Sequence, residues 1–91
     1  MTIEGLTALR QNVIEGEADL VPQLVQAALD AGEPAEVILK QGLIAAMDEV
    51  GRQFEAGDFF VPEMLFAARA MQAGLVLLKP RLQQSEVKAA G

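Results

Sequence analysis

The chain has 91 residues, a net charge of −6, a pI near 4.4, and neither cysteine nor histidine. Its length predicts one domain, which is marginally stable unless it packs well. The missing cysteines exclude disulfides and thiolate metal sites, and the missing histidines remove the commonest general base and metal ligand. The acidic balance argues against nucleic acid or an anionic membrane as a partner. Residues 1–4 lack the basic start of a signal peptide, and the apolar stretch 64–78 is too short to span a bilayer, so we expect a cytoplasmic protein.

Helical periodicity begins close to the N-terminus. Apolar residues repeat at steps of three and four over residues 3–13, and Gly16 follows as a stop signal. Asp19 is a candidate N-cap for a second helix, which tolerates Pro22 in its first turn and ends at Gly32. The apolar face of this second helix comprises Val21, Leu24, Val25, Ala28 and Leu29.

The third predicted helix has the clearest pattern in the chain. It covers residues 34–54, with Pro34 at its first position, where the missing N–H has no intrahelical partner to lose. Gly57 then breaks the pattern. The apolar stripe of this helix comprises Val37, Leu43, Met47, Val50 and Phe54.

A fourth helix is predicted to begin near Pro62 and to end at Pro80, with a kinked continuation through Leu82 as the alternative. Its connections are short and no segment alternates with a period of two, so we predict an all-α fold, an up-and-down antiparallel four-helix bundle. Residues 1–82 would form this domain, and the polar tail 83–91 would be a linker or a fraying terminus. The residues expected to face inward from the third and fourth helices are Leu43, Met47, Val50, Leu65, Ala68, Met71 and Leu75.

Three glycines fall inside predicted helices, at Gly42, Gly51 and Gly74. Glycine in a helix interior costs up to about 1 kcal/mol relative to alanine. We therefore expect a packing reason, namely that each glycine lets a neighbouring helix approach closely.

All four phenylalanines lie between Phe54 and Phe66, around the junction of the third and fourth helices. Aromatic side chains bury more area than any other type, and a fold that used them only for its core would tend to spread them out. The cluster is suited to an apolar lid over a flat ligand. A plug that closes the end of the bundle explains the same spacing.

Carboxylates also gather near this junction. Paired carboxylates can carry out acid–base chemistry or hold a divalent cation, so a catalytic bundle that uses Asp58 and Glu63 is one hypothesis. Their spacing matches no known ligand set, and a solvated acidic rim is the simpler interpretation. The cluster comprises Asp48, Glu49, Glu55, Asp58 and Glu63.

The string at residues 43–64 reads LIAAMDEVGRQFEAGDFFVPEM. With the small pair at 67–68, Met71 and Leu-Lys-Pro at 78–80, it resembles the helical cap of cobalamin-dependent methyltransferases, a family that includes methionine synthase and small methyl-carrying corrinoid proteins. A Met, Val-Gly, a Phe, a Gly, Phe-apolar-Pro, a small pair and a further Met follow the order and spacing of that family. The segment 15–32 fits the family's opening helices, so the resemblance covers nearly the whole chain.

The resemblance implies a specific role for the loop. In such proteins the bundle rests on the upper face of the corrin ring, and three side chains shelter the cobalt-bound methyl group. By motif position these cofactor-binding residues are Phe54, Val61 and Met64, with Met64 as a soft apolar filler. The cap would carry no catalytic residue or metal ligand of its own. It would shield methylcobalamin and swing away to admit a methyltransferase.

The chain departs from a complete corrinoid protein of this family in one respect. It lacks the α/β domain whose Asp-x-His-x-x-Gly motif supplies the lower cobalt ligand. We therefore expect it to be the N-terminal module of a longer protein, in which cobalamin, the α/β domain and methyltransferase subunits are its partners. A natural stand-alone cap is the alternative. The isolated module would expose the apolar loop around Phe60 and form a homodimer through it. The alternative function is a small acidic interaction module that docks a partner helix through the same loop.

Overall fold

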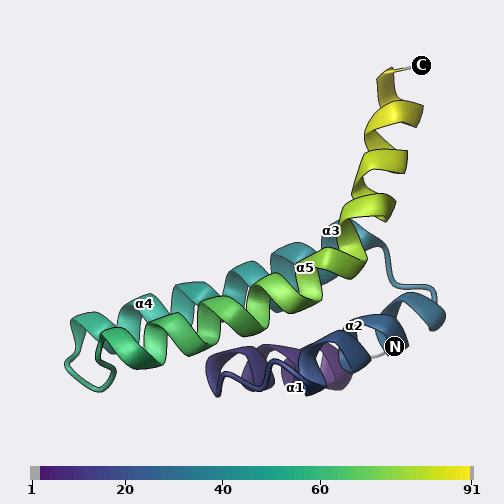
Figure 1. The fold of residues 1–91 in the computed structure, drawn as a ribbon. Coiled ribbons are helices and arrows are strands. Elements are labelled where there is room, and N and C mark those ends of the chain that lie inside the picture. The colour runs from purple at the N-terminus through teal and green to yellow at the C-terminus, as the bar shows by residue number, and fades with distance from the viewer. Residues whose placement is uncertain (1–2, 91) are drawn as a thin grey trace.

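The structure is a computed structural model that describes the backbone of residues 3–90 and the side chains of residues 6–83. It consists of helices only within this part of the chain (Figure 1). The elements are α1 (Ile3–Ile14), α2 (Leu20–Asp30), α3 (Ala35–Val37), the π-helical segment η1 (Ile38–Ile44), α4 (Ala45–Glu55) and α5 (Val61–Ala90).

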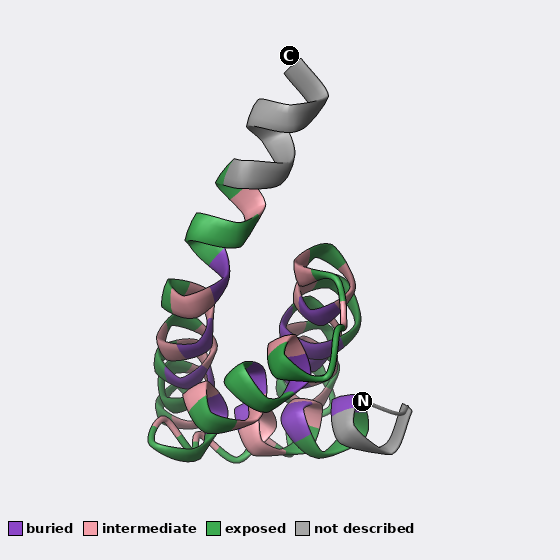
Figure 2. Cartoon of the chain, turned by 90° about the vertical axis from the view of Figure 1, so that its right-hand side faces the viewer, coloured by how far each residue is buried: buried purple, intermediate pink, exposed green. Residues whose placement is uncertain are grey.

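Four helical rods form the bundle, because α3, η1 and α4 follow one another without a break. The rods make two antiparallel hairpins: the short pair α1 and α2 packs across the long pair formed by the α3–α4 run and α5 (Figure 1). Buried residues turn towards the space between the rods (Figure 2). The predicted up-and-down four-helix bundle is confirmed.

Three of the four rods end at the glycines where the sequence predicted an end. Gly16, Gly32 and Gly57 have φ angles of 75°, 93° and 85°, in the left-handed region that glycine adopts without steric cost. At each end the two residues after the C-cap donate backbone hydrogen bonds back into the last turn, the Schellman arrangement. For α4, Gly57 N bonds to Phe54 O at 3.1 Å and Asp58 N to Gln53 O at 2.9 Å.

The predicted faces of the first two helices are confirmed within the described side chains, which do not include Ile3. Leu6, Leu9 and Val13 of α1 are buried, as are the valines and Ala28 of α2. Asp19 does precede α2, but its side chain makes no capping hydrogen bond, so the predicted cap is present by position only.

The third rod spans the predicted range, but it is not a regular α-helix. Pro34 is its N-cap residue, and η1 interrupts the middle of the rod with π-type turns. A π-turn bonds residues five apart and brings them onto one face. Ile38 and Leu43 are therefore both fully buried, whereas the regular pattern had placed Val37 inward.

Helix α5 turns a different face to the core than its large apolar residues predicted. Its buried row consists of small residues and one leucine: Ala67, Ala70, Gly74 and Leu78. Leu65 was expected inside, but 57% of it is exposed. Met71 and Leu75 pack only partly against the core. Because apolar residues surround α5 on nearly every side, periodicity alone did not identify the face that packs.

This orientation predicts unequal effects of two leucine truncations in the same helix. Replacing the fully buried Leu78 by Ala should lower the free energy of unfolding by roughly 2 to 5 kcal/mol, through lost burial and the cavity it leaves. The same change at Leu65 should cost less than about 0.5 kcal/mol, as at other exposed positions. Urea unfolding of both variants measures the difference, and equal losses would contradict the assigned face.

The predicted stop at Pro80 is wrong, because α5 continues to Ala90 with Pro80 inside it. Proline removes one helical hydrogen bond and crowds the carbonyl four residues earlier, here that of Val76. The helix turns away from the bundle near this point (Figure 1). Residues 83–90 are helical in backbone, Gly91 lies outside the described residues, and the role of 83–91 as a linker stays a prediction.

The continuous α5 is also longer than the apolar stretch 64–78. Among the described residues, the 23-residue segment Val61–Gln83 is long and apolar enough to cross a membrane by length and composition. Those two properties alone do not distinguish a membrane span from a helix covered by protein. In this fold the segment packs against α2 and α4 along one side.

Two of the three mid-helix glycines have the predicted packing role. A Cβ atom on Gly42 would lie 2.7 Å from Cδ2 of Leu9, and one on Gly74 would lie 2.8 Å from Cγ1 of Val21. Glycine therefore allows α1 and α2 to approach the long hairpin closely. Gly51 has no atom of another residue within 4 Å of such a Cβ, so the packing explanation is wrong there.

Candidate functional site

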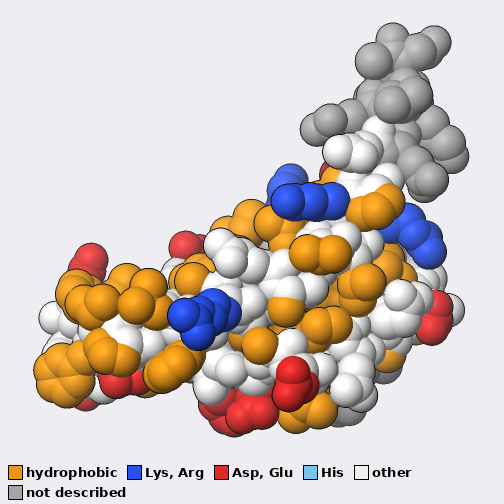
Figure 3. Space-filling view, in the orientation of Figure 1, with side chains coloured by type: hydrophobic (Ala, Val, Ile, Leu, Met, Phe, Trp, Pro, Cys, Tyr) orange, Lys and Arg blue, Asp and Glu red, His pale blue; other side chains and the backbone are white. Residues whose placement is uncertain are grey.

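The tip of the long hairpin, defined as residues 54–66, extends beyond the short hairpin (Figure 1). The difference follows from helix length: α1 and α2 have 12 and 11 residues, which corresponds to roughly 17 Å each. The rod from α3 to α4 is nearly twice as long. The short hairpin therefore reaches only the base of the tip, at Phe66, and apolar side chains gather on the end beyond it (Figure 3).

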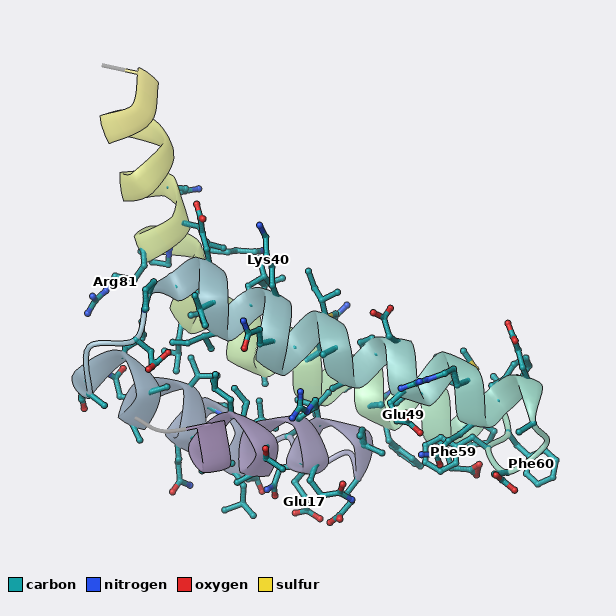
Figure 4. All side chains as sticks on the ribbon, turned by 180° about the vertical axis from the view of Figure 1, so that it is seen from behind. Glu17, Lys40, Glu49, Phe59, Phe60 and Arg81 are labelled. Carbon is teal, nitrogen blue, oxygen red and sulfur yellow. The ribbon has the colours of Figure 1, made fainter. Side chains whose placement is uncertain are left out.

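The phenylalanines of the tip are mostly exposed. Exposed fractions are 43% for Phe54, 66% for Phe60 and 55% for Phe66, whereas Phe59 is half-buried. Phe60 stands at the outer end of the hairpin and Phe59 lies nearer to Glu49 (Figure 4). The rings therefore do not fill the end of the bundle, which is what a plug requires.

The three residues predicted to contact a cofactor come from both arms of the hairpin. Phe54 lies in the last turn of α4, and Val61 is the first residue of α5. Met64 follows in the first turn of α5 and is partly buried. Val61 is 56% exposed. The fold thus places all three at the bare tip, with hydrophobic area available for a ligand.

Backbone hydrogen bonds fix the loop between the arms. Phe59 N donates to Gln53 O at 3.1 Å, next to the Schellman bonds that end α4. At the start of α5, Phe60 N donates to Oε2 of Glu63 at 2.5 Å. This bond is one half of a capping box, in which the third helical residue satisfies the N-cap N–H. The exposed side chains therefore stand on a well-defined backbone.

Two of the five acidic residues near the tip, Glu49 and Glu63, have structural partners, and the group does not form a metal-binding arrangement. Glu63 caps α5, and Glu49 pairs with Arg52 and accepts a hydrogen bond from Gln53 at 2.9 Å. In the described part of the chain, no group of three or more His, Cys, Asp or Glu residues is placed to hold a metal ion. The catalytic-bundle hypothesis with Asp58 and Glu63 therefore has no geometric support.

Sequence reasoning missed two large side chains of this surface. Leu65 had been assigned to the core, and Phe66 had been considered only as a member of the phenylalanine cluster, with no contact of its own. Phe66 lies beside the turn between α1 and α2, where a Cβ on Gly16 would be 2.8 Å from the Phe66 Cβ. The signal that could have revealed both is the small-residue spacing Ala67, Ala70 and Gly74, which marks the packed face of α5.

Comparisons with known proteins identify the family of the chain. A family model described as a B12 binding domain matches residues 6–79. The chain is 37% identical over 91 residues to trimethylamine corrinoid protein 1 of Methanosarcina acetivorans, with 97% of this chain and 42% of that protein covered. It is 43% identical over 76 residues to the dimethylamine corrinoid protein of Methanosarcina barkeri, covering 84% of this chain and 35% of that protein.

A solved structure gives the same result for the fold. The monomethylamine corrinoid protein of Methanosarcina barkeri superposes with a TM-score of 0.80 at 35% identity, over 82% of this chain and 35% of that chain. The chain thus spans about two fifths of the length of the curated relatives it matches. None of these comparisons supports the alternative of an acidic module that docks a partner helix.

The predicted resemblance is confirmed by two independent lines, the matched family model and relatives that the chain aligns with along most of its length. The helical fold agrees with both. The chain belongs to the B12-binding domain family.

Proposed function

We propose that this chain is the helical cap of a corrinoid methyl-carrier protein, where it covers the upper face of cobalamin and shields the cobalt-bound methyl group. One observation carries the proposal: the long hairpin presents an uncovered apolar tip on a fixed backbone. A soluble domain rarely leaves a large apolar patch bare unless something else covers it.

The residues at the tip fit a corrin ring chemically. Phe54, Val61 and Met64 would hold its upper face, because they offer an apolar surface with two stiff side chains and one adaptable thioether. The large exposed side chains of the tip, Phe54, Phe60 and Val61 among them, are apolar and could pack against such a ring. Bound methylcobalamin would supply the methyl group for transfer. The task of these side chains is to keep water and oxygen from the space above the ring.

The same proposal defines what the chain does not do. It carries no proton-transfer group at the tip besides exposed carboxylates, so the cap shields and a methyltransferase performs the transfer. Access for that enzyme requires the cap to move as a unit, a form of gating by domain motion. An α/β domain would supply the lower cobalt ligand, since this chain contains no histidine. We place the assembly in the cytoplasm.

A graft tests the proposal directly. The segment of trimethylamine corrinoid protein 1 of Methanosarcina acetivorans that aligns with this chain is replaced by this chain, and the chimera is loaded with methylcobalamin. We expect the chimera to bind the cofactor and to slow its photolysis about as well as the parent protein does. A version of the parent protein that lacks the grafted segment and begins directly after it serves as the uncapped control. Photolysis as fast in the chimera as in that control would overturn the proposal.

A further inference from the structure

A second exposed surface runs along α5, away from the core. We define the outer stripe as Leu65, Arg69, Gln72 and Val76, which follow one another at steps of four, three and four residues and so share one helix face. All four are exposed, with 57% for Leu65 and 63% for Val76. The opposite side of α5 is the small-residue row that packs on the bundle. The stripe is therefore fixed in place by packing and has no partner within the chain.

The stripe has a two-fold pattern. In the sequence, Leu65 and Val76 are equally far from the midpoint between Ala70 and Met71. The same is true of Arg69 and Gln72. If two copies of α5 lie antiparallel about that point, Leu65 of one copy faces Val76 of the other. Arg69 then faces Gln72 of the second copy, and its guanidinium can donate to the amide oxygen. Such an isologous contact is what a C₂ dimer requires.

Charge along the hairpin supports the antiparallel direction. Residues 64–83 contain Arg69, Lys79 and Arg81 and no acidic residue. The tip carries exposed acids, among them Glu55 and Asp58. Lys40 and Arg81 lie at the end of the long hairpin opposite Phe60 (Figure 4). The far end also carries Glu33 and Glu36, which balance part of its positive charge. Antiparallel pairing brings the acidic tip of each copy to the C-terminal part of α5 of the other, with its Lys79 and Arg81, whereas parallel pairing brings the two acidic tips together.

We propose that the outer stripe of α5 is a docking surface for a second copy of this chain, paired antiparallel about the midpoint between Ala70 and Met71. Lys79 of each copy then lies opposite Pro62 of the other, because Lys79 and Pro62 share the same midpoint, and Asp58 stands one turn before Pro62 at the acidic tip. The proposal goes beyond the cap function. Phe54, on α4, stays outside the contact, whereas Val61 lies four residues before Leu65 on the same face and stands at its edge. The case for the cap depends on the exposed tip and not on the dimer, so failure of the dimer would not affect it.

The contact should be weak, because one helix face per copy buries less surface than a standard stable interface. Sedimentation velocity over roughly 10 μM to 1 mM covers the range expected for such an interface. We expect a monomer–dimer equilibrium. Val76→Glu should abolish the dimer, because it sets an unpaired carboxylate against Leu65 of the second copy. Ile44→Glu is the matched control, at an exposed apolar residue of η1 outside the stripe, and should leave association unchanged.

Cross-linking tests the direction of pairing. Because the chain has no native cysteine, any disulfide must form between the introduced residues. A mixture of Leu65→Cys and Val76→Cys chains should form a mixed disulfide under mild oxidation, far faster than Leu65→Cys chains alone. In a separate test, Lys79→Glu should weaken the dimer several-fold, and adding Asp58→Lys should restore it by exchanging the two charges.

Four outcomes would overturn the proposal. In sedimentation, these are a monomer at every concentration and a dimer unaffected by Val76→Glu. In cross-linking, it is Leu65→Cys chains that join to one another faster than they join to Val76→Cys chains. The fourth is a dimer lost in Phe60→Ser but kept in Val76→Glu. The last would place the contact at the tip. Flotation of the monomer with anionic vesicles, lost in Val76→Glu, would likewise count against a second copy as the occupant of the stripe.

Discussion

Combining Phe54→Ala with Val61→Ala in the capped chimera is expected to speed photolysis of bound methylcobalamin and oxidation of the reduced cofactor several-fold, without loss of the cofactor. Both side chains are exposed at the hairpin tip, at 43% and 56%, so truncation removes apolar cover rather than core packing. The cofactor should stay bound because its lower side would be held by the other domain. Shielding and binding are therefore predicted to separate.

Aerobic absorbance spectroscopy follows both processes in one sample. Ile44→Ala is the control, since Ile44 is as exposed as Phe54 but lies about 15 Å further back along the same rod. It should behave like the unmodified chimera. Unchanged rates in the double variant would show that Phe54 and Val61 are ordinary surface residues, and the shielding role would have to be abandoned.

Gly16→Ala should be the most destabilising of the alanine substitutions at the three helix-ending glycines. An alanine in the left-handed region costs about 1 to 2 kcal/mol at any of them. At Gly16 the new Cβ would also lie 2.8 Å from the Phe66 Cβ and 3.3 Å from its carbonyl carbon. These atoms cannot rotate away, so α5 must shift, which adds about 1 to 3 kcal/mol as overpacking does.

Gly57→Ala isolates the backbone effect, because its φ is similar and no atom lies within 4 Å of the added Cβ. Urea unfolding monitored by circular dichroism compares the two variants. The free energy of unfolding should fall clearly further for Gly16→Ala. If both variants lose the same amount, the turn between α1 and α2 does not press against α5, and the packing described here at Phe66 is incorrect.

Much of the fold could be predicted from local chemistry. Gly16, Gly32 and Gly57 ended helices because a left-handed residue closes the Schellman hydrogen bonds, a property that depends on the glycine and its neighbours alone. The faces of α1 and α2 followed from helical spacing, since each helix is apolar on one side only. The family assignment also came from a local string, residues 43–64, together with its flanking positions.

The tertiary structure decided what local chemistry left open. Helix α5 is apolar on nearly every side, so only contact with Val21 and its neighbours determined that Gly74 and the alanines face inward and Leu65 outward. The π-turns of η1 shifted the buried residue from Val37 to Ile38. The spacing from Leu78 to Leu82 allowed a kinked continuation past Pro80, but the helix continues further, to Ala90.

The exposure of the candidate site is the clearest property that only the tertiary structure determined. The sequence by itself determined that aromatic residues gather at one helix junction, and it allowed both a lid and a plug. Whether these aromatic residues are exposed or buried depended on the relative lengths of the two hairpins and on how they pack together. Helices α1 and α2 end before the outer part of the tip, so Phe54, Phe60 and Val61 stay uncovered. Whether a side chain is buried depends on what the rest of the chain brings to it, and this information is not contained in the spacing of one segment.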